Sequence, residues 1–424
     1  MSVRSRAVRG TGAGLVSLIL LSGCGGGGEG DDVTLRFTWW GADHRHALTE
    51  EIVELFEEEN PHITIDTEYT GWDEYWDSMA TQAAGGNAPD VFQMDEQYLR
   101  EYADRGSLLE LDGVDVSDFE ETAVENGMVE DSLYAITMGI NAQVILANPV
   151  LFDEAGVELP DDETWTWDDF AETIGELNAN LDDAYGFVGS GGLGMFQTWL
   201  RQQDRSISTE DGGVGFDVAD AQEFFEFFEE IQSQEGAPTP AVMEENGSVG
   251  LEQSLAATGG SAFSNFWTNE SVALTEMVGN ELEIMRYPSF AGDVEDSSPW
   301  YKSSMYLSAS SGTDHPEEAQ MFIDFFMNSE EAAMVNVVER GIPPNTEIRD
   351  MVMDELEGVE ADTVEFIDRI EPQVGDPEPI TAQGLSDFHE TINRYSMLVF
   401  FGESDPQGAA EDMVAEVEGS VGGE

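Results

Sequence analysis

The stretch YAITMGINAQVILANPVLFDEAG, residues 134–156, decides the fold of this chain. It opens with an apolar, partly β-branched segment from Ile136 to Leu146, which predicts extended structure. Asn148-Pro149 then starts a short helix, and Gly156 ends it. We expect this stretch to carry the chain out of one compact α/β unit and into a second one.

Asn141 interrupts the apolar segment, and a buried amide side chain needs hydrogen-bond partners. A cleft between two lobes would supply a ligand or water as that partner. A strand end whose amide is satisfied by neighbouring side chains is the alternative, and the sequence leaves both open. Around residues 300–307 and again around 340–345, the pattern indicates that the chain crosses back.

Upstream of this stretch, strands and helices alternate. The patterns predict strands at 33–40, 62–69 and 90–94, with an amphipathic helix between each pair. This β-α-β-α-β order implies a mostly parallel sheet, because parallel neighbours need helical crossovers. In such sheets ligands bind beyond the carboxyl ends of the strands. Those ends carry Trp39, Trp40, Gly41, Asp43, Asp95 and Glu96.

Downstream, a strand at 185–188 leads into Gly189, Gly191 and Gly194, which fit G-x-G-x-x-G before a helix. A nucleotide-binding loop, a loop that brings backbone amides to a cleft and a plain surface loop are all compatible with this position. The other expected elements are a helix with a capping box at 166–169, a strand at 261–267, helices starting at Pro316 and spanning 329–340, and helices from 350 to 419 with a proline-rich break at 372–379.

The composition is extremely acidic. The 424 residues include 89 Asp plus Glu against 15 Lys plus Arg, and Lys302 is the only lysine. At 41% hydrophobic residues the chain has material for two cores, so the acids must lie on folded surfaces. Nucleic acid and anionic membranes would be repelled. Because the formal net charge of −74 repels itself unless it is screened, we predict adaptation to high salt.

The amino terminus has the features of a secretory signal peptide. Arginines at positions 4, 6 and 9 precede an apolar run at 15–21, and Leu21-Ser22-Gly23-Cys24 follows. The last four residues resemble a bacterial lipobox, in which cleavage after residue 23 leaves Cys24 as a lipidated first residue. Residues 24–32 then form a tether. Because Cys24 is the only cysteine, no internal disulfide and no cysteine-based site can form.

Candidate catalytic groups do not stand out. Among 89 carboxylates almost any two can be paired on paper, so a glycosidase-type acid and base cannot be identified. His44 and His46 lack a third ligand at suitable spacing for a metal. The five histidines give no recognisable nucleophile triad. We therefore expect no catalytic residues, no metal, no cofactor and no enzymatic activity.

Tryptophans are the more informative residues, because they gather at predicted strand ends and helix starts. Aromatic faces that pack against a sugar ring, with carboxylates and amides binding its hydroxyls, would require this composition. Core packing is the alternative for any one of them. The tryptophans at these positions are Trp39, Trp40, Trp72, Trp199, Trp267 and Trp300.

Several motifs, in this order, resemble one family, the extracellular sugar-binding lipoproteins of ABC importers, the maltose-binding-protein-like class. The resemblance covers nearly the whole chain after the signal peptide. The motifs are the lipobox 21–24, Trp39-Trp40-Gly41, FEEENPHITI at 56–65, AAGGNAPDV at 83–91, YAI at 134–136, NPVLFDEAG at 148–156, residues 164–170, HPEEA at 315–319 and GIPPN at 341–345.

The resemblance implies an α/β fold of two lobes, the type II periplasmic-binding-protein-like fold, with three hinge crossovers. The N-terminal lobe would comprise 33–138 with 303–340, and the C-terminal lobe 139–302 with 341–424. A neutral sugar or oligosaccharide would bind between the lobes and be delivered to the ABC permease. The protein would be a monomer, exported and anchored by Cys24 to the outer face of the cytoplasmic membrane.

By the same resemblance, tryptophan and tyrosine would stack on the sugar, while Asp95, Asn141 and Arg340 would bind its hydroxyls. The scarcity of lysine disfavours anionic sugars. A receptor for a non-sugar solute, such as a polyol, osmolyte or peptide, and a secreted polysaccharide hydrolase are the alternatives. The implied contacts are Trp39, Trp40, Asp43, Trp72, Asp95, Asn141, Trp267 and Arg340, with Trp199 and Tyr301 as further contacts.

Overall fold

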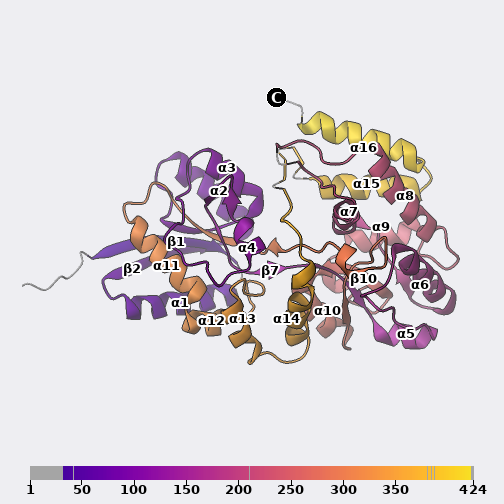
Figure 1. Ribbon diagram of the computed structural model, residues 1–424, viewed down its shortest axis with the longest axis horizontal. Helices are drawn as coiled ribbons and strands as arrows, with labels where there is room; N and C mark the ends of the chain where they lie inside the picture. Colours follow the sequence, from indigo (N-terminus) through magenta and orange to yellow (C-terminus); the bar gives the residue numbers. More distant parts are fainter. Residues whose placement is uncertain are drawn as a thin grey trace, which may run out of the picture.

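The computed structural model describes residues 32–421, except 42, 210, 380, 383 and 386, and leaves out the side chains of 43, 73 and 84. The predicted signal peptide, Cys24 and all of the tether before residue 32 lie outside the described residues. Figure 1 shows two lobes side by side, with β7 (Ile140–Asn141) between them. Each lobe has its own sheet and its own hydrophobic core.

The first lobe is built on a five-stranded sheet in the order β2-β1-β3-β13-β6. β1 pairs in parallel with β2 and β3, which confirms the parallel sheet predicted from the β-α-β-α-β order. β13 and β6 are antiparallel to their neighbours, because they belong to segments that cross between the lobes. The strands are β1 (Val33–Trp40), β2 (Ile63–Thr70), β3 (Val91–Met94), β13 (Tyr306–Ala309) and β6 (Ile136–Thr137).

Helices cover both faces of this sheet, and a short hairpin joins β4 to β5. The helix predicted at 329–340 is shorter than expected: α12 ends at Asn336, and Val337 takes the left-handed φ of 47°. Residues 337–341 instead form turns, with the Gly341 N–H donating to the Val338 carbonyl (3.0 Å). The elements are α1 (Asp43–Glu59), α2 (Trp72–Ala84), α3 (Glu96–Asp104), α4 (Glu121–Glu125), β4 (Met128–Val129), β5 (Ser132–Leu133), α11 (Pro316–Asn328) and α12 (Glu330–Asn336).

The second lobe contains a four-stranded sheet in the order β11-β8-β10-β9. Its central strand β8 is buried on both faces, so its side chains alternate between two cores rather than between core and solvent. Ile145 and Ala147 join the larger core, whereas Val144 and Leu146 join a smaller one that includes Tyr301. The strands are β8 (Gln143–Ala147), β9 (Tyr185–Phe187), β10 (Ser261–Trp267) and β11 (Glu283–Met285).

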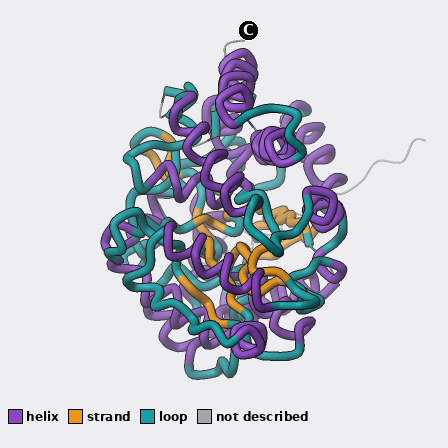
Figure 2. The backbone as a smooth tube through the Cα atoms, turned by 90° about the vertical axis from the view of Figure 1, so that its right-hand side faces the viewer, coloured by secondary structure: helices purple, strands orange, loops and turns teal. Residues whose placement is uncertain are grey.

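Local signals set the ends of the surrounding helices, which enclose the strands in Figure 2. The predicted capping box is present: the Thr166 hydroxyl accepts from the Asp169 N–H (3.0 Å). Gly156 ends the preceding helix with a left-handed φ of 66°. The helices are α5 (Pro149–Ala155), α6 (Trp167–Asn180), α7 (Gly192–Arg201), α8 (Val218–Gln232), α9 (Pro240–Ser248), α10 (Ser271–Val278), α13 (Thr346–Met353), α14 (Val359–Ile370), α15 (Phe388–Phe400) and α16 (Pro406–Val421).

Three crossing segments meet between the lobes as one narrow ribbon. β7 pairs antiparallel with β12 (Lys302–Ser303) on one side. On its other side, the Ile140 N–H donates to the Ile342 carbonyl (2.8 Å) and the Ile342 N–H donates back (3.2 Å). The single strand expected at 136–146 is therefore three strands. β6 belongs to the first sheet, β7 to the ribbon and β8 to the second sheet.

Candidate functional site

An aromatic cluster lies beyond the carboxyl ends of β1 and β3 in the first lobe. Its members are Trp40, Trp72, Tyr75, Trp76 and Tyr98, and we call it the Trp40 cluster. The Trp72 ring stands edge-on to Trp40, with ring centroids 4.9 Å apart, and Tyr98 stacks on Trp76 at 3.9 Å. Trp72 is 38% exposed although Trp40 is buried. The cluster thus offers an apolar platform at Trp72 that rests on buried aromatic rings.

Two carboxylates follow directly after β3, beside this cluster. Asp95 caps α3, with its Oδ1 accepting from the Gln97 N–H (3.1 Å). Glu96 is the first residue of α3, and its Oε2 lies 4.0 Å from the Lys302 ammonium of β12. Partial burial raises the pKa of both carboxyls, and the nearby Lys302 charge opposes the rise. These groups place hydrogen-bonding oxygens next to the aromatic platform.

The second lobe brings a matching set of groups to the junction. Trp267, at the end of β10, lies under the Lys302 ammonium, with 5.4 Å from Nζ to the ring centroid. It stands perpendicular to Trp300 at 6.2 Å, and the Arg201 guanidinium covers the Trp300 ring at 5.2 Å. Arg201 also pairs with Glu378 (2.6 Å). Burial raises the pKa of Glu378, and the Arg201 guanidinium beside it opposes the rise.

Two further polar side chains, Gln143 and Tyr287, lie in the second lobe near Trp300. The Gln143 Oε1, at the first residue of β8, accepts from the Tyr287 hydroxyl (2.9 Å).

The predicted glycine loop does lie between β9 and α7, and Gly191 has a φ of 79° there. A Cβ at Gly191 would overlap the rings of Phe224 and Phe228, so packing explains this glycine without a bound phosphate.

The structure places three predicted contacts in hydrophobic cores, which corrects the expectation that the tryptophans as a set line a cleft. Trp39 is fully buried and its Nε1 donates to His46 Nδ1 (3.0 Å). Trp199 packs against Phe290 at 4.6 Å inside the second lobe. The Tyr301 hydroxyl donates to the Ile367 carbonyl (3.2 Å), and burial raises its pKa. Trp300 is also buried, at 3% exposure.

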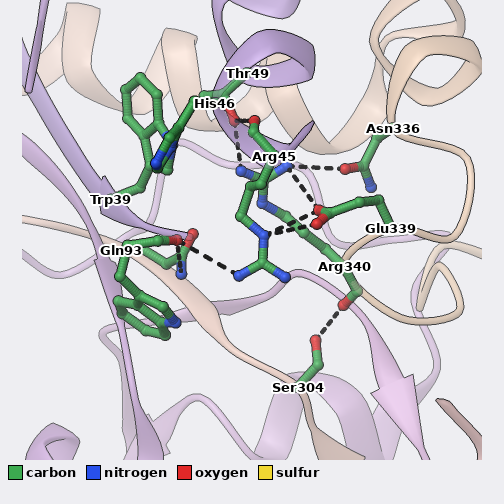
Figure 3. Close-up of polar contacts among 10 residues, drawn as sticks. Trp39, Arg45, His46, Thr49, Gln93, Ser304, Asn336, Glu339 and Arg340 are labelled. Atoms are coloured by element: carbon green, nitrogen blue, oxygen red, sulfur yellow. Dashed lines mark hydrogen bonds and ion pairs between the residues drawn. The ribbon is translucent and has the colours of Figure 1, made fainter. Parts of the chain in front are cut away.

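Arg340 likewise holds the protein together (Figure 3). Its Nη2 donates to the Thr49 hydroxyl (2.6 Å) and its Nη1 to Asn336 Oδ1 (3.0 Å). The residue is 1% exposed, and burial lowers its pKa to about 9. Its neighbour Glu339 accepts two hydrogen bonds from Arg45 Nε, at 2.9 and 3.0 Å. The guanidinium expected to bind a sugar hydroxyl thus fastens the third crossing segment to α1.

Asn141 also finds a partner inside the protein. Its Oδ1 accepts from the Thr268 hydroxyl (3.3 Å), and the residue is 6% exposed. Of the two readings left open by the sequence, this contact supports a strand end satisfied by its neighbours. Asp43 begins α1, but its side chain lies outside the described atoms.

Sequence reasoning missed several groups at the junction. Lys302 could have been found, because a lone lysine in so acidic a chain is conspicuous. The others carry no local signal, since the fold alone brings them together: Trp76, Tyr98, Gln143, Arg201, Tyr287 and Glu378.

Among the described residues, no group of three or more His, Cys, Asp or Glu is arranged to hold a metal ion. Within the same part of the chain, no helix combines the length and apolar character needed to cross a membrane. Aromatic and hydrogen-bonding side chains of both lobes thus meet beside the ribbon, and Trp72 is the exposed indole among them.

Residues 41–333 match the model of the bacterial extracellular solute-binding protein family, and the chain belongs to that family. The fold is that of a family 1 extracellular solute-binding protein from Alicyclobacillus acidocaldarius (TM-score 0.79, 24% identity, 92% of this chain and 98% of that one). A periplasmic oligogalacturonide-binding protein from Yersinia enterocolitica is similar (TM-score 0.78, 22% identity, 91% and 98%). These neighbours have the type II two-lobe fold, which confirms the predicted fold class.

Curated relatives are similar over shorter stretches. A putative binding protein of Brucella abortus is 26% identical over 142 residues, 32% of this chain and 34% of the relative. An uncharacterized lipoprotein of Streptomyces antibioticus is 29% identical over 170 residues, 38% of each chain. The multiple sugar-binding protein of Streptococcus mutans is 24% identical over 149 residues, 34% of each. The matched stretches thus span little more than a third of these relatives.

Proposed function

We propose that this protein is the substrate-binding component of an ABC importer and that it binds a neutral sugar or oligosaccharide between its lobes. The observation that carries the proposal is the exposed indole of Trp72 in an aromatic cluster that reaches Tyr98 of α3, the helix that Asp95 and Glu96 begin at the carboxyl end of β3. An aromatic face next to hydrogen-bond acceptors suits the apolar and hydroxyl sides of a sugar ring.

The names of similar proteins support a carbohydrate as the ligand, whether neutral or acidic. Structural neighbours include the oligogalacturonide-binding protein and a Listeria monocytogenes ABC substrate-binding protein in complex with cycloalternan (TM-score 0.72, 21% identity). A curated relative is named for sugar binding. By analogy, the loaded protein closes about the ribbon and delivers its ligand to the membrane permease.

The remaining parts of the proposal concern the whole protein. We place the first lobe at 33–138 with 303–340 and the second at 139–302 with 341–424, in keeping with the two sheets. Cys24 carries the lipid that holds an exported monomer on the outer face of the cytoplasmic membrane, and the acidic surface suits high salt. The protein is a receptor and turns nothing over.

A thermal-shift screen of residues 25–424 in molar salt tests the function. Sugars, polyols and osmolytes are compared, and a ligand at about 100 times its dissociation constant should stabilise the native state by roughly 2.7 kcal/mol. A shift by one class of sugar, which is recovered unchanged, supports the proposal. Consumption of the sugar would indicate a hydrolase, and a shift only with polyols or osmolytes would indicate a non-sugar receptor.

A further inference from the structure

Lys302 lies at the junction of the two lobes and is the only lysine in a chain with 89 acidic residues. It lies on β12 and pairs in register with Asn141 of β7. Its side chain therefore leaves the ribbon where the lobes meet. It is 47% exposed, so solutes can reach it.

The ammonium of Lys302 contacts one group from each lobe. Its Nζ lies 4.0 Å from Glu96 Oε2 at the start of α3 and 5.4 Å from the ring centroid of Trp267 at the end of β10. An indole face attracts a cation through its quadrupole, and a carboxylate attracts it through its charge. Together they have the chemistry of a binding site for an ammonium ion, and this site is filled by the protein's own side chain.

The same arrangement occurs a second time nearby. The Arg201 guanidinium lies 5.2 Å from the Trp300 ring centroid and 2.6 Å from Glu378 Oε1. The two indoles, Trp267 and Trp300, stand perpendicular at 6.2 Å. The side chains of Arg201 and Glu378 are each 11% exposed, whereas the Glu96 side chain is 30% exposed. Both indoles at the junction thus hold a cation against a glutamate, and only the Lys302 example is open to solutes.

We propose that Trp267 and Glu96 form an ammonium-binding site between the lobes, and that Lys302 fills it so that the wild-type protein rejects cationic solutes. Without Lys302, the carboxylates at the junction would attract amines and quaternary ammonium compounds. A covalently attached ammonium stays beside the site whatever amines are present in solution. Lys302 is thus a specificity-determining residue that favours neutral ligands. This role rests on the proposed function, whereas the test described next does not depend on it.

The test uses Lys302→Met, which keeps most of the alkyl stem and removes the charge. The probe is tetramethylammonium, titrated at constant chloride concentration and compared with the neutral isostere tert-butanol. The readout is the indole N–H resonance of Trp267, assigned by its loss in Trp267→Phe. We expect saturable binding of tetramethylammonium to Lys302→Met at least about tenfold tighter than to the wild type, and no such gain for tert-butanol.

Matched variants separate the site from general charge effects. Arg100→Met removes one positive charge from a half-exposed ion pair on α3, so it should show no gain. Lys302→Arg keeps a cation in the site and should bind tetramethylammonium no better than the wild type. Adding Glu96→Gln to Lys302→Met should remove the gain in tetramethylammonium affinity. Equal tetramethylammonium affinity in wild type and folded Lys302→Met would overturn the proposal. A wild type that binds no carbohydrate would sink the proposed function alone.

Discussion

Gly139 lies so close to the backbone of Arg340 that a Cβ atom at position 139 would overlap the Arg340 carbonyl oxygen. The same glycine accepts a hydrogen bond from the Ser304 N–H (2.8 Å), so it touches both of the other crossing segments. Its φ is not positive, so space and not backbone conformation requires glycine here. The three crossings can lie together because position 139 has no side chain.

Gly139→Ala should therefore lower the free energy of unfolding by about 1–3 kcal/mol, because the ribbon must spread to admit a methyl group. Denaturant unfolding in molar salt measures the loss. Gly247→Ala is the control: Gly247 lies exposed in α9 with nothing near its missing Cβ, so alanine should add about 0.5–1 kcal/mol. An unchanged midpoint for Gly139→Ala would mean that the crossings are less tightly packed than the structure indicates.

Arg340→Met should destabilise the protein and leave ligand affinity within about twofold. Its removal leaves the acceptor atoms of Thr49 and Asn336 without their donors, which costs about 1–3 kcal/mol for the buried Thr49 and less for the half-buried Asn336. Thermal unfolding and calorimetric binding, measured on the same preparation, separate the two effects. If affinity fell by orders of magnitude while stability held, Arg340 would be a ligand contact after all.

Trp72→Ala should show the opposite pattern. Because Trp72 is 38% exposed at the edge of the Trp40 cluster, its loss should weaken sugar binding by about tenfold or more and change the unfolding temperature little. Isothermal titration with the sugar identified by the screen measures the change. Phe401→Ala, which truncates an aromatic side chain of similar exposure (46%) far from the junction, is the matched control. Undiminished sugar affinity in Trp72→Ala would mean that the Trp40 cluster does not contact the sugar.

The unfolding temperature should rise as sodium chloride is increased from low to molar concentration. The formal charge of −74 repels itself over a Debye length that shrinks to about 3 Å at 1 M salt. For lobes of this size, each kcal/mol of relieved repulsion should raise the unfolding temperature by about 2–4 °C. Chloride is used because sulfate stabilises most proteins by exclusion. A flat curve would contradict the predicted high-salt adaptation.

Lowering the pH from 7 towards 5 should stabilise the fold. Burial raises the pKa of Asp95, Glu96, Glu270 and Glu378 in the folded state above their ordinary values of 3.8 for Asp and 4.5 for Glu. The folded protein therefore binds these protons more tightly than the unfolded chain, so their stabilising effect is present at acid pH and is lost as pH rises through the folded-state pKa values.

Glu96→Gln gives the matched comparison for this pH dependence. The variant lacks one of the raised carboxyls, so its unfolding temperature should change less between pH 5 and pH 7 than that of the wild type. Neighbours that act on Glu96 are Lys302, which lowers its pKa, and Asp95, which raises it. A wild-type stability that climbs steadily from pH 5 to pH 7 would reverse the sign argued here.

The sequence predicted the elements whose signals are local. The Thr166 capping box, the proline that opens α11 and the glycine that ends α5 each depend on residues within one turn, and all three are confirmed. The parallel order of β1, β2 and β3 followed from the intervening helices. The split of 136–146 into three strands did not, because pairing with residues 302–303 and 342 decides it.

Burial at the candidate site could not be predicted in the same way. Trp39 and Trp40 are adjacent at the end of β1 and point to opposite faces of the sheet. Trp39 packs on Tyr69 and donates to His46, whereas Trp40 meets Trp72. Which face opens to the junction depends on where α1 and α2 lie. The contacts of Arg340 could not be predicted for a similar reason, since its partner Thr49 is 291 residues away in sequence.

The place of β13 in the first sheet governs the order in which the chain can be completed. β13 lies between β3 and β6, so residues 306–309 must arrive before β6 has a neighbour to pair with. The whole second sheet, whose strands end at residue 285, precedes β13 in the chain. Of the two sheets, the one that begins first during synthesis is therefore the last to be completed. Until then the half-built sheet leaves the β3 edge unpaired, where another chain could dock.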